Sequence, residues 1–164
     1  MNNLKTTAAT KRIAIAATDN KRADLIEWSY FNKDILTKHQ LTAIGETGIV
    51  LEGTLNITVN KLFTADTGGY HQLASLIENG NIDMLFFFAE PDSSIEKDLD
   101  LKNLLVVAAT HNVIVASNKV TTEMVMASEF SRNEQPVKRK NSSGFLKQTI
   151  SFFSQFTRPI IPAV

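Results

Sequence analysis

The sequence contains no cysteine, and its three histidines, His39, His71 and His111, are far apart along the chain. Without cysteine there can be no disulfide, no zinc–thiolate site and no thiol nucleophile. Three scattered histidines do not give the closely spaced ligands of a metal site. We therefore expect neither a metal nor any other cofactor.

No excess of either charge is present, because 17 Lys and Arg residues balance 17 Asp and Glu residues. This balance gives no reason to expect nucleic acid as a partner. The charges are nevertheless unevenly placed: residues 1–131 hold 11 basic and 16 acidic residues, whereas residues 132–164 hold 6 basic residues and one acidic residue, Glu134. A mildly acidic body is thus followed by a basic tail.

Long hydrophobic runs are also missing. Nothing approaches the roughly 18 apolar residues that a membrane span requires. The stretch "IAIAA" after Lys11 and Arg12 is too short for a signal peptide and is soon followed by Asp19. We expect a soluble, cytoplasmic protein.

Short apolar runs are present, and each precedes a helix-like segment. The runs cover residues 12–18, 41–45, 60–64, 83–89 and 113–117, and the helices are expected over 21–32, 49–55, 71–79, 99–111 and 121–128. Continuous apolar runs are typical of parallel strands covered on both faces. The pattern predicts an α/β fold: a doubly wound, five-stranded parallel sheet with helices on both faces, in three layers. Ligands of such sheets bind beyond the carboxyl ends of the strands.

The strand and helix alternation stops near Phe130, and we predict one domain over residues 1–131. Residues 132–144 are polar, basic and turn-rich, which indicates a linker. Residues 145–164 form a tail that begins with "FLKQTISFFSQF", whose apolar residues fall on one face of a helix. This amphipathic C-terminal helix is expected to dock on the protein's own subunits, on a partner or on a membrane surface.

Two glycine-containing loops follow predicted strands. In "IGETG", Gly45, Thr47 and Gly48 are suited to hold phosphate oxygens at a helix N-terminus, although Glu46 would repel them. The alternative is a plain strand-to-helix turn. "TADTGGY" offers a second cradle through its glycine pair, again with a simple turn as the alternative, and its aspartate is most simply a solvated loop acid.

An acidic segment follows the fourth predicted strand. Its residues are Glu90, Asp92, Glu96, Lys97, Asp98 and Asp100. Acidic residues at this place usually belong to a solvated helix start, where the positive end of the helix dipole favours them. The alternative is that one of them is a catalytic carboxylate. No P-loop, dinucleotide-binding fingerprint or Ser-His-Asp order is present in the sequence.

Taken together, these loops resemble methylglyoxal synthases over roughly residues 11–130. The resemblance rests on "IAIAATD", on "TAIGETG", on "TADTGGYHQLASLIENGNIDMLFFFAEP" and on "DLDLKNLLVVAATHNVIVASNKVTTEMV". It implies enzymes that convert dihydroxyacetone phosphate to methylglyoxal and phosphate without a metal, usually as homohexamers. The chemistry needs a carboxylate base, an electrophile for the enediolate and donors for the leaving phosphate.

The resemblance also shows which site positions differ. The family's proton-abstracting aspartate aligns with Tyr70 and its polarising histidine with Lys97, while a second histidine aligns with Thr18. One phosphate-binding threonine is replaced by Glu46, and the phosphate-binding lysine by Arg22. A phenol with a reference pKa near 10 is a poor base at neutral pH.

Other positions keep the pattern of the family. The retained or adjoining substrate-site candidates are Asp19, Gly45, Thr47, Gly48, Thr64, Ala65, Gly68, Gly69 and Asp100, with Glu90 in place of an aspartate. A C-terminal phosphate-binding arginine of the family has no counterpart that can be placed in the tail.

Three functions remain open on this evidence. The first is a methylglyoxal synthase-like protein with weak or lost activity that keeps a site for a small phosphorylated molecule or another ligand. Lys97 and Glu46 would then pair across the cleft. The second is an active synthase in which Asp66 or Asp100 replaces the base and Lys97 polarises the carbonyl. The third is a non-catalytic ligand-binding or scaffold protein that presents its basic tail.

Overall fold

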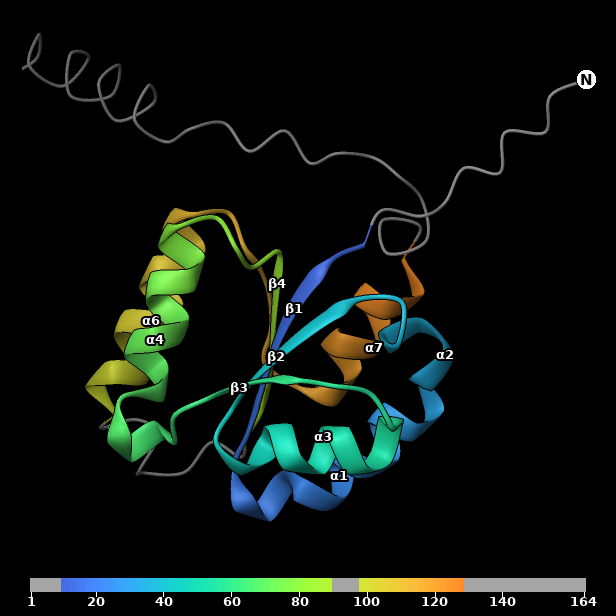
Figure 1. The fold of residues 1–164 in the computed structure, drawn as a ribbon. Coiled ribbons are helices and arrows are strands. Elements are labelled where there is room, and N and C mark those ends of the chain that lie inside the picture. The colour runs from blue at the N-terminus through green and yellow to red at the C-terminus, as the bar shows by residue number, and fades with distance from the viewer. Residues whose placement is uncertain (1–9, 90–97, 129–164) are drawn as a thin grey trace, which may run out of the picture.

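The computed structural model describes residues 10–89 and 98–128, which form a parallel sheet between two layers of helices (Figure 1). The strands are β1 (Arg12–Ala17), β2 (Gln40–Ile44), β3 (Asn60–Leu62), β4 (Met84–Phe88) and β5 (Ile114–Ala116). Their order in the five-stranded sheet is β3-β2-β1-β4-β5, and every neighbouring pair is parallel. The chain therefore moves outward from β1 to β3, crosses back and continues through β4 to β5, which confirms the doubly wound topology.

A helix follows each strand, as the sequence predicts. The helices are α1 (Arg22–Phe31), α2 (Lys33–Leu36), α3 (Glu46–Leu55), α4 (Gly69–Glu78), α6 (Leu99–Thr110) and α7 (Lys119–Ala127), of which α2 is an additional short helix after α1. Figure 1 shows α4 and α6 together on one side of the sheet, and α1, α3 and α7 on the other. The three-layer α/β architecture is thus confirmed.

Alternation along the strands divides the core between the two faces of the sheet. Ile13 and Ile15 of β1 belong to a buried cluster with Trp28 of α1, whereas Ala14 and Ala16 belong to a second cluster on the side of α4 and α6. Because successive side chains of a strand point to opposite faces, one strand supplies both clusters. Strands buried on both faces explain why the apolar runs are continuous in the sequence.

Some helices begin earlier than their apolar residues indicate. Helix α3 starts at Glu46, three residues before the predicted start, and α4 starts at Gly69. Both first turns consist of polar or glycine residues next to the cavity described below, so hydrophobic periodicity does not mark them. Helix α2 and two short 3₁₀ turns, Asp19–Lys21 and Ala65–Thr67, were not predicted from the sequence.

Several predicted features lie outside the described residues. These are the side chains of Glu90 and Lys97, the linker over residues 132–144 and the amphipathic tail over residues 145–164. Across residues 10–89 and 98–128, no helix combines the length and the apolar character needed to cross a membrane.

Candidate functional site

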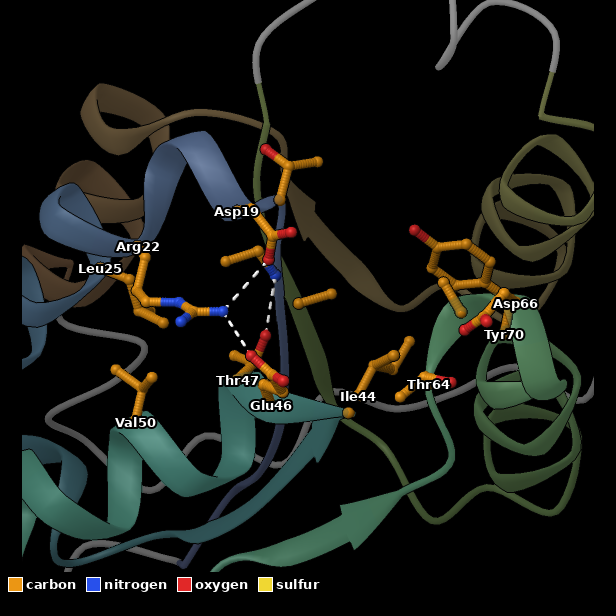
Figure 2. A pocket seen from close by; sticks show the side chains of 15 residues that line it. Asp19, Arg22, Leu25, Ile44, Glu46, Thr47, Val50, Thr64, Asp66 and Tyr70 are labelled. Atoms are coloured by element: carbon orange, nitrogen blue, oxygen red, sulfur yellow. Dashed lines mark hydrogen bonds and ion pairs between the residues drawn. The ribbon is translucent and has the colours of Figure 1, made fainter.

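A cavity of about 450 Å³ opens at the carboxyl ends of β1 and β2 (Figure 2). This volume lies within the range of small-molecule sites, and the position is where doubly wound sheets bind ligands. The cavity is lined by Ala16, Ala17, Thr18, Asp19, Arg22, Leu25, Ile44, Gly45, Glu46, Thr47, Val50, Thr64, Ala65, Asp66 and Tyr70.

The first turn of α3 forms one side of the cavity. Gly45 precedes this helix with a φ of 54°, a left-handed conformation that favours glycine. Its amide donates to the carbonyls of Leu62 and Phe63, at 3.2 and 3.1 Å, and so ties the turn to the end of β3. Thr47 is buried, and its hydroxyl oxygen accepts a hydrogen bond from the amide of Ala17 at 3.3 Å. The turn is thereby held against β1.

An ion-pair cluster occupies the same side. The Arg22 guanidinium donates to a Glu46 carboxylate oxygen at 2.5 Å and to an Asp19 carboxylate oxygen at 3.2 Å. Figure 2 shows these three side chains converging beside Thr47. We call Asp19, Arg22, Glu46 and Thr47 the arginine side of the cavity. Among the described residues, Glu46 has Arg22 as its partner. The predicted pair of Glu46 with Lys97 stays a prediction, because Lys97 lies outside the described residues.

The first turn of α4 and the loop before it form the opposite side, which we call the tyrosine side: Thr64, Asp66 and Tyr70. The glycine pair before Tyr70 shapes this side through backbone geometry. A Cβ added to Gly69 would lie 2.2 Å from the carbonyl oxygen of Phe63, so only glycine fits there. Gly68, Gly69 and Gly48 are not among the residues that line the cavity.

Tyr70 points from α4 into the cavity, with its phenol oxygen toward the arginine side (Figure 2). Its side chain is only 8% exposed. Burial, together with the nearby negative charge of Asp98, raises the pKa of Tyr70 to about 12. The phenol is therefore neutral at physiological pH and is not a general base there.

Asp66 lies next to Tyr70 on the tyrosine side (Figure 2). It is exposed to the cavity, and within the described part of the chain its carboxylate makes no hydrogen bond or ion pair. A free carboxylate at this place is able to accept a proton or to bind a cation.

Comparison with known proteins finds methylglyoxal synthases that are similar to this chain over most of its length. The chain is 41% identical to a methylglyoxal synthase of Cellvibrio japonicus over 73% of the chain and 78% of the relative. It is 32% identical to a methylglyoxal synthase of Vibrio cholerae over 88% of the chain and 95% of the relative. The chain belongs to the methylglyoxal synthase family. No family model matches the sequence.

A solved structure extends the likeness to the fold. The crystal structure of methylglyoxal synthase from Elizabethkingia anophelis superposes with a TM-score of 0.73 at 30% identity, over 94% of this chain and 95% of that one. The resemblance seen in the sequence is therefore correct for the family and for the fold.

Most of the site positions that the family resemblance selects do meet in one place. Thr18, Asp19, Arg22, Glu46 and Tyr70 all line the cavity, although they come from loops after different strands. Asp66, one of the two alternative bases, lines it too, whereas Asp100 does not. Asp100 instead lies on α6, with a carboxylate oxygen 3.8 Å from Nδ1 of His71 on α4.

Most apolar lining residues were missed by reasoning from the sequence, although Ala65 was selected and does line the cavity. Leu25 and Val50 close the arginine side, and Ala16, Ala17 and Ile44 form the ends of the strands beneath the cavity. The predicted strand ends were a usable signal for the last three residues. Leu25 and Val50 lie one helical turn inside α1 and α3, where nothing in the sequence separates a cavity residue from a core residue.

Metal-ligand clusters are absent from the described part of the chain, where no three His, Asp or Glu side chains are placed to share an ion. The chemistry available within the described lining is that of carboxylates, one guanidinium, one neutral phenol and several hydroxyls.

Proposed function

We propose that this methylglyoxal synthase-like protein has weak or no synthase activity and uses its cavity to bind another small molecule. The observation that carries the proposal is the pairing of Arg22 with Glu46 at the first turn of α3. The family resemblance assigns both positions to phosphate binding. Here the cation already has a carboxylate partner, attached to the same helix N-terminus that would receive the phosphate.

A tethered carboxylate competes with a free phosphate at high effective concentration. Both side chains are partly exposed, with 44% exposure for Arg22 and 66% for Glu46, so their pairing contributes little to stability. The pairing matters for the ligand instead. A phosphate has to displace Glu46 from Arg22 and then remain beside the negative charge of Glu46.

The replaced base supports the same proposal. Tyr70 occupies the aligned position of the aspartate, and its raised pKa removes it as a base at neutral pH. Loss of a positioned base lowers a rate by about 10² to 10⁴, and loss of an electrostatic donor by about 10² to 10³. The loss of the base at Tyr70 and the loss of the free cation at Arg22 affect different steps of one reaction and would act together.

The direct test is phosphate release from dihydroxyacetone phosphate, with the Cellvibrio japonicus relative assayed in parallel. We expect the chain to be slower by at least about 10³-fold. A rate within tenfold of the relative would overturn the proposal.

A second candidate is an active synthase in which Asp66 is the base, because Asp66 is unpaired within the described residues and lies beside Tyr70 (Figure 2). Under this candidate function, Asp66→Asn abolishes whatever turnover the chain has. Asp100→Asn tests the other candidate base, which lies beside His71 and outside the lining. Unchanged turnover in both variants would eliminate both carboxylates as the base.

A further inference from the structure

We propose that the cavity takes a small cationic ligand, an amine that also carries hydroxyl groups, with its ammonium group against Asp66 and Tyr70. This inference rests on the proposed function, because it names the class of molecule that replaces the phosphorylated substrate.

The charge of the described lining favours a cation. The lining contains three carboxylates, from Asp19, Glu46 and Asp66, and one guanidinium, from Arg22. Two of the carboxylates already contact Arg22, so the arginine side alone carries an excess negative charge. A cleft with one sign of charge concentrates ligands of the opposite sign and disfavours a phosphate dianion.

The tyrosine side supplies a built contact for the ligand. Tyr70 is more than nine-tenths buried, its phenol oxygen faces the cavity, and no described residue forms a hydrogen bond with it. A hydroxyl that opens on a cavity and has no partner among the described residues is available to water or to a ligand group. The neutral phenol and the Asp66 carboxylate both offer acceptor oxygens, which suit the three donors of an ammonium group.

Thr47 supplies a contact for a hydroxyl group of the ligand. It is only 7% exposed, and its oxygen accepts from the Ala17 amide. Within the described residues, the Thr47 hydroxyl donates to no acceptor and lines the cavity. Its proton is therefore available to a ligand oxygen. An ammonium site on one side and a hydroxyl site on the other match a short amino alcohol.

The inference can be tested by isothermal titration calorimetry of the full chain with three probes of similar size. The probes are 2-amino-1,3-propanediol, which is cationic, glycerol, which is neutral, and glycerol 3-phosphate, which is anionic. We expect saturable binding of the amine below about 10 mM, and weaker or no binding of the other two. Amine binding should weaken as salt is added, because it is electrostatic.

Asp66→Asn should reduce the affinity for the amine by about tenfold or more, since a charge-assisted contact is lost. Asp34→Asn is the matched control: Asp34 is an exposed carboxylate on α2 and does not line the cavity, so this variant should bind like the wild type. Circular dichroism of both variants establishes that they fold.

Three results would overturn the inference: no saturable amine binding, tighter binding of glycerol 3-phosphate than of the amine, or equal amine affinity in Asp66→Asn and the wild type. The proposed function fails on a different result, which is phosphate release at a rate typical of the relatives. A chain that is silent in that assay and yet prefers glycerol 3-phosphate refutes the ligand class alone.

Discussion

Within the described residues, the environment of Tyr70 departs clearly from that of an ordinary tyrosine. Its pKa is raised from 10 to about 12 by burial and by the charge of Asp98. The folded state therefore holds the phenolic proton more tightly than the unfolded state does. The resulting contribution to stability is fully present below pH 10 and is lost as the pH rises toward about 12.

We predict that Tyr70→Phe removes this pH dependence. Each unit of pKa difference corresponds to about 1.4 kcal/mol, so the free energy of unfolding of the wild type should fall by about 2 to 3 kcal/mol more than that of the variant between pH 9 and 12. Urea unfolding at several pH values measures the difference. The control is Tyr30→Phe, whose side chain is 65% exposed. A parallel pH dependence of Tyr70→Phe and the wild type would contradict the account.

At the residue scale, the sequence selected many of the residues that line the cavity and did not predict the pairing of Arg22 with Glu46. The family resemblance selected Arg22 and Glu46 separately. The hypothesis drawn from the sequence joined Glu46 to Lys97, and that pair stays a prediction because Lys97 lies outside the described residues. Arg22, the partner among the described residues, is 24 residues from Glu46 along the chain and reaches it from the first turn of α1. Such a contact depends on how two loops meet and on side-chain conformations, which hydrophobic patterns do not encode.

The connection between β3 and α4 is the element on which the tyrosine side depends. The amide of Gly69 donates to the carbonyl of Thr64 at 2.8 Å, and the glycine lies directly against the backbone of Phe63 and Thr64. This close approach sets the first turn of α4 and thus the direction of Tyr70.

We predict that Gly69→Ala destabilises the protein by about 1 to 3 kcal/mol or more, because its Cβ would meet a backbone oxygen that cannot move without shifting the turn. Gly53→Ala is a matched control, because Gly53 lies in α3 with no atom near its added Cβ. This control should stabilise the protein by about 0.5 to 1 kcal/mol, since alanine is the better helix former. Equal stabilities of the two variants in urea unfolding would contradict the packing described here.

Whole elements were more predictable than their ends. The five strands follow from continuous apolar runs, and the strand ends correctly located the cavity. Helices α3 and α4 begin earlier than predicted because their first turns are formed by "ETG" and "GY", which serve the cavity and the turn and not the core.

At the scale of the whole molecule, both core clusters, as far as the described residues form them, lie within residues 13–126. The predicted domain over residues 1–131 should therefore fold without the tail. We expect a chain that ends at residue 131 to unfold within a few degrees of the full chain, and circular dichroism on heating measures this. Loss of cooperative unfolding would show that the tail belongs to the folded domain.

The assembly and the tail stay predictions. The family resemblance implies a homo-oligomer, a hexamer in the usual case, and the amphipathic tail is expected to dock on subunits, on a partner or on a membrane surface. Sedimentation velocity of the full and shortened chains tests the homo-oligomer, and co-sedimentation with liposomes tests docking of the tail on a membrane surface. Equal pelleting of both chains with liposomes would discard the membrane surface.

The central claim is that Glu46 occupies Arg22 in place of a phosphate. The most direct test is isothermal titration calorimetry of inorganic phosphate with the wild type and with Glu46→Thr. If Glu46 holds the cation of the phosphate site, the wild type should show no saturable binding up to about 10 mM, and the variant should gain binding through the freed Arg22. Glu78→Gln, an exposed change at the far end of α4, is the control and should behave like the wild type. Phosphate binding by the wild type as tight as that of Glu46→Thr would contradict the account.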